Sequence, residues 1–318
     1  MSKTHKLLAC SYFLVGFMVA SIIYSSKNDS PGNLAKQYAV SQPIYKNETK
    51  GANLEDEQMS KNNITTIHLI GERHCGTKWI TNHLTECFGD DVRVFNRYSR
   101  WKHWFQYEDE QKISPGSALV VAMFRDPYDW IDSMRKKPYH SPNHFNLDWK
   151  EFLTRPWTME RGPADKGLLK SNSKYNTTCM HRFPFDEVIP CSRLDRNMYN
   201  GTMNGKTVGV TYELNHDGSG QAYDSILELR SDKIKNFLGL KDFDGVGSFI
   251  PVQFEYMVTR GTSELINEVE NLTGIRAHCK GTQPQLLRSK TFDPLFVEWM
   301  NEHLDWETER LIGYNMKK

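Results

Sequence analysis

Cysteine is scarce in this chain, and neither sign of charge is in excess. None of the six cysteines forms a Cys-x-x-Cys pair, which disfavours a structural zinc site. The 40 lysines and arginines balance 39 acidic residues, so the net charge is only +1 and gives no electrostatic footprint for a nucleic acid. No internal repeat is found. We therefore expect one globular core of roughly 250 residues with appendages, no metal site and no nucleic-acid partner.

Long hydrophobic runs are also rare, and one stands out near the amino terminus. Leu7 to Tyr24 is 18 residues without a charge, just long enough to span a bilayer. The preceding Lys3 and Lys6 favour a cytosolic amino terminus, which predicts a single-pass type II protein of a secretory-pathway membrane. A cleaved signal peptide is the alternative. The predicted parts are a cytoplasmic tail (1–6), a transmembrane signal anchor (7–24), a flexible stem (25–63) and a lumenal domain (64–318).

Sequons and cysteines fit a lumenal compartment. Six Asn-x-Ser/Thr sequons follow the anchor, a poorer one at Asn28 beside the membrane and five farther along the chain, which modestly favours a secretory glycoprotein. Cys179 and Cys191 flank a loop without regular periodicity, and we predict that they form a disulfide. The five farther sequons lie at Asn47, Asn63, Asn176, Asn200 and Asn271.

A glycine-bounded loop follows the first apolar β-branched run of this domain. Thr65–Ile70 reads as a strand and Ile80–Phe88 as a helix, so the loop between them gathers backbone N–H groups that can surround an anion. Gly71 and Gly76 have the separation of a Walker A loop. However, Thr77 precedes Lys78, the reverse of the order that holds Mg²⁺ at a nucleoside triphosphate. A metal-assisted phosphoryl transferase is therefore disfavoured.

A second segment has the same organisation. Ala118–Phe124 is a continuous apolar run, typical of a buried parallel strand, and Arg125 follows it directly. Asp126-Pro127 suits the start of a helix. Ser133 then lies about two turns into that helix, eight residues after Arg125.

Together these motifs resemble the Golgi-type, membrane-anchored sulfotransferase family. Gly71-Glu-Arg-His-Cys-Gly-Thr-Lys-Trp79 is similar to the family's 5′-phosphosulfate loop, and the spacing of Arg125 and Ser133 is similar to that of its 3′-phosphate site. Weaker likeness extends from about Ile64 to Tyr314. The resemblance implies a three-layer, P-loop-like α/β domain with a mainly parallel central sheet. It also implies transfer of a sulfuryl group, without a metal, from 3′-phosphoadenosine 5′-phosphosulfate (PAPS) to a glycan or glycoprotein acceptor.

The resemblance also implies roles for individual residues. His103, which follows a lysine as in several family members, is the candidate base, and His74 and Lys78 would act at the leaving phosphate. The family usually has lysine where His74 stands, and histidine carries charge only when protonated. A base among the carboxylates at 108–110 is the alternative to His103. The expected cofactor-binding residues are Arg73, His74, Cys75, Gly76, Thr77, Lys78, Trp79, Arg125, Ser133, Lys280 and Gly281.

Other functions remain open at this level. Because His74 departs from the family pattern, the chain is alternatively a catalytically inactive lumenal binding protein with the same fold. A metal-independent lumenal glycosyltransferase is the third option. A homodimer is compatible with the sequence, which does not identify the acceptor.

Overall fold

The computed structural model gives the fold of most of the predicted lumenal domain. The predicted tail, anchor and stem (1–63) lie outside the described residues, as does Cys191 of the predicted disulfide. Within the part described, no helix has both the length and the apolar character needed to cross a membrane. The described residues are 64–108, 112–139, 141, 144–157, 178–180, 188–190, 199–203, 206–210, 213, 215, 222–287 and 290–317.

A four-stranded parallel sheet forms the centre of the domain. Its strand order is β2-β1-β3-β8, and each neighbouring pair runs parallel. Every residue of β1 and β3 is buried, as expected for strands covered on both faces. The α/β class with a mainly parallel sheet is therefore confirmed for the described residues. The strands are β1 (Thr66–Gly71), β2 (Arg93–Phe95), β3 (Ala118–Phe124) and β8 (Val246–Gln253).

Helices follow the strands, and most begin where the sequence places an Asp or Ser cap. Both predicted helices at the motifs form, and Asp126 accepts a hydrogen bond from Asp129 N at the start of the second. The helices are α2 (Thr77–Phe88), α3 (Pro127–Lys136), α4 (Trp149–Thr154), α6 (Ile226–Gly239), η4 (Leu240–Asp242), α7 (Phe254–Arg260), α8 (Ser263–Thr273), α9 (Pro294–His303) and α10 (Trp306–Leu311).

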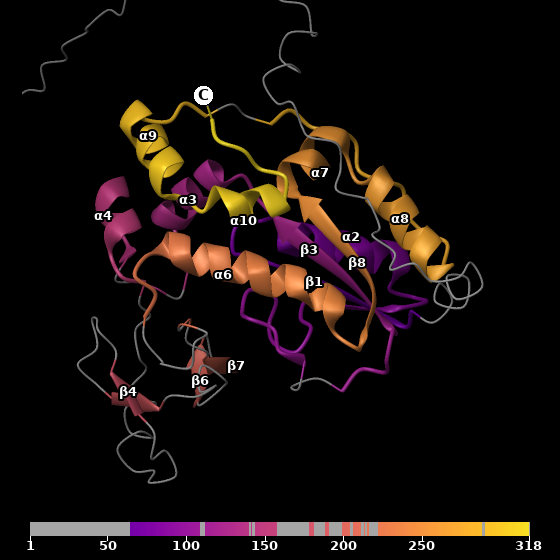
Figure 1. Cartoon of the computed structure of the whole chain (residues 1–318). Helices are drawn as coiled ribbons and strands as arrows, with labels where there is room; N and C mark the ends of the chain where they lie inside the picture. The colour runs from indigo at the N-terminus through magenta and orange to yellow at the C-terminus, as the bar shows by residue number, and fades with distance from the viewer. Residues whose placement is uncertain are drawn as a thin grey trace, which may run out of the picture. The chain divides into compact units, whose positions relative to one another are not determined.

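The sheet lies between α2 and α6 (Figure 1). Strand residues Val120, Ala122 and Phe124 share a buried cluster with Ile234 and Phe237 of α6. Helix α2 contacts β1 and β2. Two short antiparallel hairpins are described separately, β4 (Thr178–Met180) with β5 (Val188–Pro190), and β6 (Tyr199–Met203) with β7 (Lys206–Val210).

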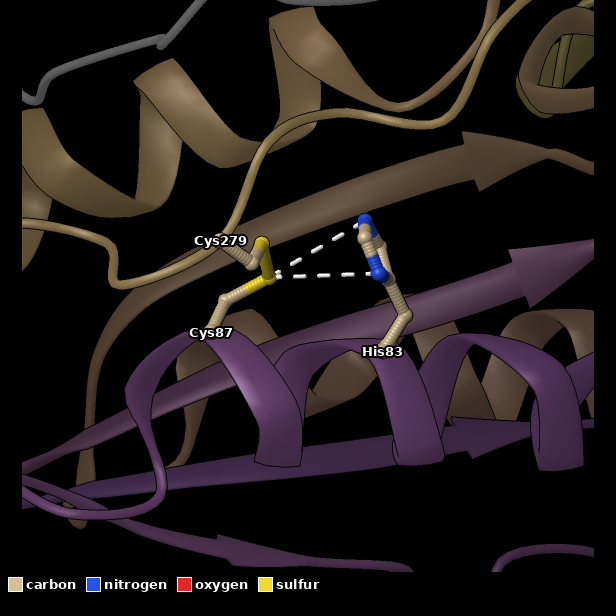
Figure 2. A group of neighbouring side chains, drawn as sticks. All are labelled: His83, Cys87 and Cys279. Carbon is tan, nitrogen blue, oxygen red and sulfur yellow. Dashed lines mark hydrogen bonds between the residues drawn. A yellow bond between two sulfur atoms is a disulfide. The ribbon is translucent and has the colours of Figure 1, made fainter.

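A disulfide that the sequence did not predict joins Cys87 of α2 to Cys279, 192 residues later (Figure 2). The backbone reinforces this link, since His278 N donates to Cys87 O at 2.9 Å. His83, one helical turn earlier, lies beside the sulfurs, and the potential ligand atoms of the three residues lie within 4.8 Å of one another. Because metal binding requires thiolates, the bonded sulfurs leave this cluster with a single ligand, His83.

Candidate functional site

The predicted anion loop and Arg125 meet at one edge of the sheet. Since the strands are parallel, the segments after β1 and β3 both leave from their carboxyl ends, and β1 and β3 are direct neighbours. The chain continues from β1 to β2 on one side and later to β3 on the other. Such a reversal of strand order opens a crevice at the carboxyl ends, where α/β proteins bind ligands.

The two glycines bounding the loop are required by packing. A Cβ on Gly71 would lie 2.6 Å from Met123 O, and one on Gly76 would lie 2.7 Å from the Phe254 ring. Gly76 also has a φ of 76°, a left-handed conformation that glycine adopts without steric cost. The loop is thus held tightly between β3 and the start of α7.

The amino terminus of α2 differs from most other helix starts in the described part of the chain. Its cap residue is Gly76, no side chain caps it, and its first turn holds no acidic residue. A helix start without such a partner offers its N–H groups and its dipole to an external anion. Side chains instead cap α3, α4, α6, α9 and α10, namely Asp126, Asp148, Ser225, Asp293 and Asp305.

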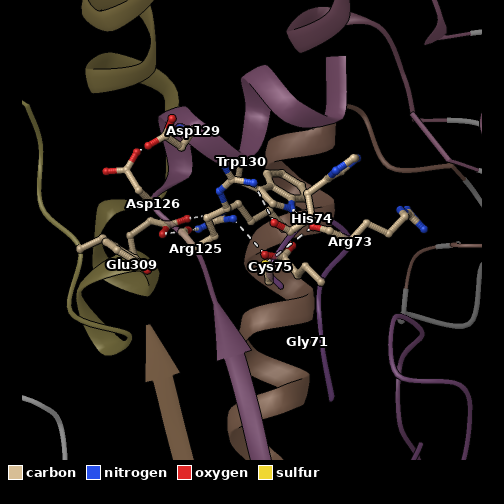
Figure 3. A network of polar contacts seen from close by, with 12 residues as sticks. Gly71, Arg73, His74, Cys75, Arg125, Asp126, Asp129, Trp130 and Glu309 are labelled. Carbon is tan, nitrogen blue, oxygen red and sulfur yellow. Dashed lines mark hydrogen bonds and ion pairs between the residues drawn. The ribbon is translucent and has the colours of Figure 1, made fainter. Parts of the chain in front are cut away.

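Arg125 connects the second motif to the loop (Figure 3). Its Nη1 donates to His74 O at 2.8 Å, and its guanidinium lies 5.0 Å from the centre of the Phe254 ring. Its buried Nε has no hydrogen-bond partner among the described residues. A buried donor without a partner is costly, so this atom suits an anionic oxygen supplied by a ligand.

Ser133 lies on the face of α3 that contacts the loop. Trp130 Nε1 donates to Arg73 O, and Lys137 O accepts a hydrogen bond from His74 Nε2, each at 2.9 Å. Residues 130, 133 and 137 have the i, i+3, i+7 spacing of one helical face. Arg125 contacts the loop directly, and Ser133 lies on the same face of α3 as the two residues that contact it.

His74 is a neutral imidazole in this setting. Because Lys137 O only accepts hydrogen bonds, His74 Nε2 carries the proton, and the ring stacks on Tyr139 at 5.0 Å. Burial lowers the pKa of His74, and the charges of Arg125, Arg73 and Lys137 lower it further. His74 is therefore mostly uncharged at neutral pH.

Arg73 extends away from Arg125 (Figure 3). Its Nη2 donates to Glu213 at 2.5 Å, and its guanidinium lies between Trp104 and Trp157, at 5.3 and 5.7 Å from their rings. Its side chain is 3% exposed. The backbone of Arg73 therefore belongs to the loop, whereas its charge lies in a buried cluster beside it.

His103 lies against the end of β1. Its Nδ1 donates to Gly71 O at 2.7 Å, and Gly71 N donates to Lys102 O at 3.0 Å. The first bond fixes the tautomer and leaves the lone pair on Nε2. Burial holds the pKa of His103 well below its ordinary value, and Arg73, Lys102 and Lys233 add to this effect. His103 is thus unprotonated and adjacent to the loop, while its lowered pKa makes it a weaker base than a histidine that titrates near neutral pH.

Two lysines provide positive charge near the loop. Lys78 is exposed in the first turn of α2. Lys102 is 6% exposed, and both burial and the charge of Lys78 lower its pKa. Sequence analysis did not select Lys102 for the site, although its place directly before His103 could have suggested it.

The remaining loop residues, Cys75, Thr77 and Trp79, pack in the loop or α2, and burial raises the pKa of the Cys75 thiol.

A buried ion cluster that the sequence analysis missed contacts the loop from α6. Arg230 is 0% exposed and donates to both carboxylate oxygens of Glu309, to Glu72 Oε2 at 2.9 Å and to Arg125 O at 2.8 Å. Glu72 is the first loop residue, and burial raises its pKa to about 7. Arg230 and Lys233 lie four and seven residues after Ile226, on the same stripe of α6. This spacing is the feature of the sequence that could have identified them as inward-facing charges.

Lys280 and Gly281 lie next to the disulfide. A Cβ on Gly281 would lie 2.2 Å from Ser263 Oγ, and Thr282 N donates to Thr262 Oγ1 at 2.7 Å. The segment is therefore fixed against the start of α8, while Lys280 itself is exposed. Among the described residues, no hydrogen bond, ion pair or ring contact joins Lys280 or Gly281 to the loop or to Arg125.

Glu108, one of the carboxylates considered as an alternative base to His103, lies away from the loop. Glu108 Oε1 accepts from Asp244 N at 2.6 Å, just before β8 and hence at the opposite, amino end of the strands. Asp109 and Glu110 lie outside the described residues. The Asp-x-Asp triplet at 242–244, a pattern typical of metal-dependent glycosyltransferases, lies at that same amino end.

Glu255 makes stability depend on pH. Its carboxylate accepts from Asp126 N at 3.1 Å and Tyr314 O–H at 2.7 Å, and burial raises its pKa from 4.5 to about 7. The folded state then binds more protons than the unfolded state between these values, so this carboxyl contributes less stability as pH rises through that window.

We therefore expect Glu255→Gln to flatten the pH dependence of stability. Between pH 5 and pH 7.5, the free energy of unfolding of the variant should rise relative to that of the wild type by on the order of 2 kcal/mol. Urea unfolding at several pH values measures this difference. Glu302→Gln, at a side chain 64% exposed, is the control and should show no such gain. A difference between Glu255→Gln and wild type that stays constant with pH would contradict the assignment.

Comparison of the chain with known protein families, curated proteins and solved structures finds no match.

Proposed function

We propose that this chain is a membrane-anchored, lumenal sulfotransferase of the Golgi or another secretory-pathway compartment. In this proposal a P-loop-like α/β domain transfers a sulfuryl group from PAPS to a hydroxyl or amine of a glycan. The observation that carries it is the junction of the two motifs, where Arg125 Nη1 meets His74 O at 2.8 Å at the reversal of strand order. One anion site at the loop and another at Arg125 match a donor with phosphates at both its 5′ and 3′ positions.

The residues present suit this donor. The uncapped start of α2 and the backbone of residues 73–78 would hold the 5′-phosphosulfate. Arg125, with its unpartnered Nε, and Ser133 would hold the 3′-phosphate, and Lys280 with Gly281 would border the nucleotide. When bound, PAPS supplies the sulfuryl group, whose bond to the 5′-phosphate oxygen breaks as the bond to the acceptor forms.

The chain's own residues then have distinct tasks. Lys78 and Lys102 place positive charge near the loop, where the leaving phosphate gathers negative charge. His103 receives the acceptor proton at Nε2, because its Nδ1 is occupied by Gly71 O. Arg125 and the loop align the donor, so that most of the rate enhancement comes from positioning and electrostatics.

Ligand-induced stabilisation tests the donor site. Adenosine 3′,5′-bisphosphate should raise the melting temperature of the wild type, because a ligand at 100 times its Kd stabilises the native state by about 2.7 kcal/mol. Arg125→Ala should weaken binding about 10- to 100-fold through the lost charged hydrogen bonds. Adenosine 5′-monophosphate, which lacks the 3′-phosphate, should bind both proteins alike.

Arg135→Ala is the matched control, because Arg135 lies on α3 near Ser133 and is 34% exposed. It should retain the full shift. Absence of any shift in the wild type would contradict the donor assignment. An equal shift in Arg125→Ala would contradict the role of Arg125 alone.

The neutral state of His74 favours a second candidate, a binding protein that retains the donor site without catalysis. Transfer of labelled sulfate from PAPS to a panel of glycans separates the two. Transfer to any acceptor excludes the binding protein. Donor binding without transfer to any member of the panel supports it.

A further inference from the structure

Glu213 lies between two buried cations. Its Oε2 accepts from Arg73 Nη2 at 2.5 Å and from Trp157 Nε1 at 2.8 Å, and its Oε1 accepts from Lys233 Nζ. The side chains of Arg73, Glu213 and Lys233 are 3%, 0% and 3% exposed. One carboxylate thus bridges residues that are 160 positions apart in the sequence.

Each cation is attached to a different half of the candidate site. Arg73 is part of the anion loop, and its carbonyl oxygen is held by Trp130 Nε1 at 2.9 Å. Lys233, on α6, donates from Nζ to His103 O at 2.7 Å. Glu213 is therefore linked to the loop through one partner and to His103 through the other.

The positive charges of Arg73 and Lys233 require a carboxylate between them. Arg73 and Lys233 both lie beside the Trp104 ring, at 5.3 and 5.4 Å from its centre. Although burial opposes ionisation of Glu213, the two cations lower its pKa overall. The ionised carboxylate offsets their mutual repulsion, which is strong between buried charges. Without it, Arg73 loses its hydrogen bond to Glu213 and Lys233 keeps its bond to His103 O alone.

We propose that Glu213 is a positioning residue, which fixes the separation between the anion loop and His103 by bridging Arg73 and Lys233. The inference rests on the proposed function, because His103 is the base only if the chain transfers a group to an acceptor. Glu213 acts through its two partners, Arg73 and Lys233.

Glu213→Gln tests the bridge, since it keeps the size of the side chain and removes its charge. We expect sulfate turnover to fall about 10- to 100-fold, the effect of a misplaced catalytic group. The affinity for adenosine 3′,5′-bisphosphate should change less than about threefold, because the backbone of the loop remains. Nitrogen NMR of labelled histidine should show that His103, assigned with His103→Gln, loses its single Nδ1–H tautomer.

Glu309→Gln is the matched control, because it removes a buried carboxylate from Arg230 instead. It should destabilise the fold while leaving the His103 signals unchanged. In a Lys233→Met background, Glu213→Gln should alter the His103 signals no further, since the bridge is already broken.

His103 signals that are unchanged in Glu213→Gln would overturn the proposal, whatever the activity. If the wild type transfers no sulfate to any acceptor, the proposed function fails, and the His103 signals still decide whether Glu213 links the two segments.

Discussion

Arg230→Met is expected to lower the free energy of unfolding by about 3–5 kcal/mol, because it removes one partner of a buried ion cluster. Arg230 is 0% exposed and pairs with Glu72 and Glu309. Methionine retains the apolar stem beside Trp130 but leaves two buried carboxylates without their cation. The loss corresponds to roughly 10 °C in melting temperature for a domain of this size.

The pH dependence of this loss identifies its cause. Without the guanidinium, the pKa values of both carboxyls rise further, so the variant binds protons more readily than the wild type. The penalty should therefore shrink as pH falls. Chemical denaturation between pH 5 and pH 8 measures it.

Lys235→Met is the matched control on the same helix. The Lys235 side chain is 56% exposed and pairs with Asp305 at 3.4 Å, and exposed pairs contribute at most about 1 kcal/mol. Replacing Glu72 and Glu309 by glutamine together with Arg230→Met should restore part of the stability, because no unpaired charge remains. An Arg230→Met variant as stable as Lys235→Met would contradict this account.

Loss of the Cys87–Cys279 disulfide is expected to have an effect of similar size. The bond closes a loop over a sequence separation of 192 residues, for which the chain-entropy model gives about 5 kcal/mol, while measured effects are typically 2–4 kcal/mol. The double variant Cys87→Ser with Cys279→Ser should unfold at a correspondingly lower urea concentration than the oxidised wild type.

A reductant provides the internal control. Dithiothreitol should lower the unfolding midpoint of the wild type toward that of the double variant and leave the double variant unchanged. Cys75, the other cysteine with a described side chain, is already a free buried thiol. A double variant that dithiothreitol destabilises further would place the reducible bond elsewhere, for example at Cys179 and Cys191.

The positions of the motifs could be predicted from the sequence, because each depends on nearby residues. The run Ala118–Phe124 is a strand because it is apolar throughout. Asp126-Pro127 begins a helix because the aspartate caps it and the proline suits its first turn.

The polar interior could not be predicted in this way. Arg230 and Lys233 interrupt an apolar stripe on α6, and their partners lie 79 and 20 residues away, at Glu309 and Glu213. Nothing local identifies these partners. The pairing of Cys87 with Cys279 was missed for the same reason.

By itself, the sequence determined the strand, loop and helix at each motif, and the spacing that puts Ser133 on the loop-facing side of α3. Only the tertiary structure decided which charges are available there. It partly buries His74 beside Lys137 O and lowers its pKa, pairs Arg73 with Glu213, and places His103 against Gly71. Local backbone preferences act over a few residues, whereas burial and ion pairing depend on segments that only folding brings together.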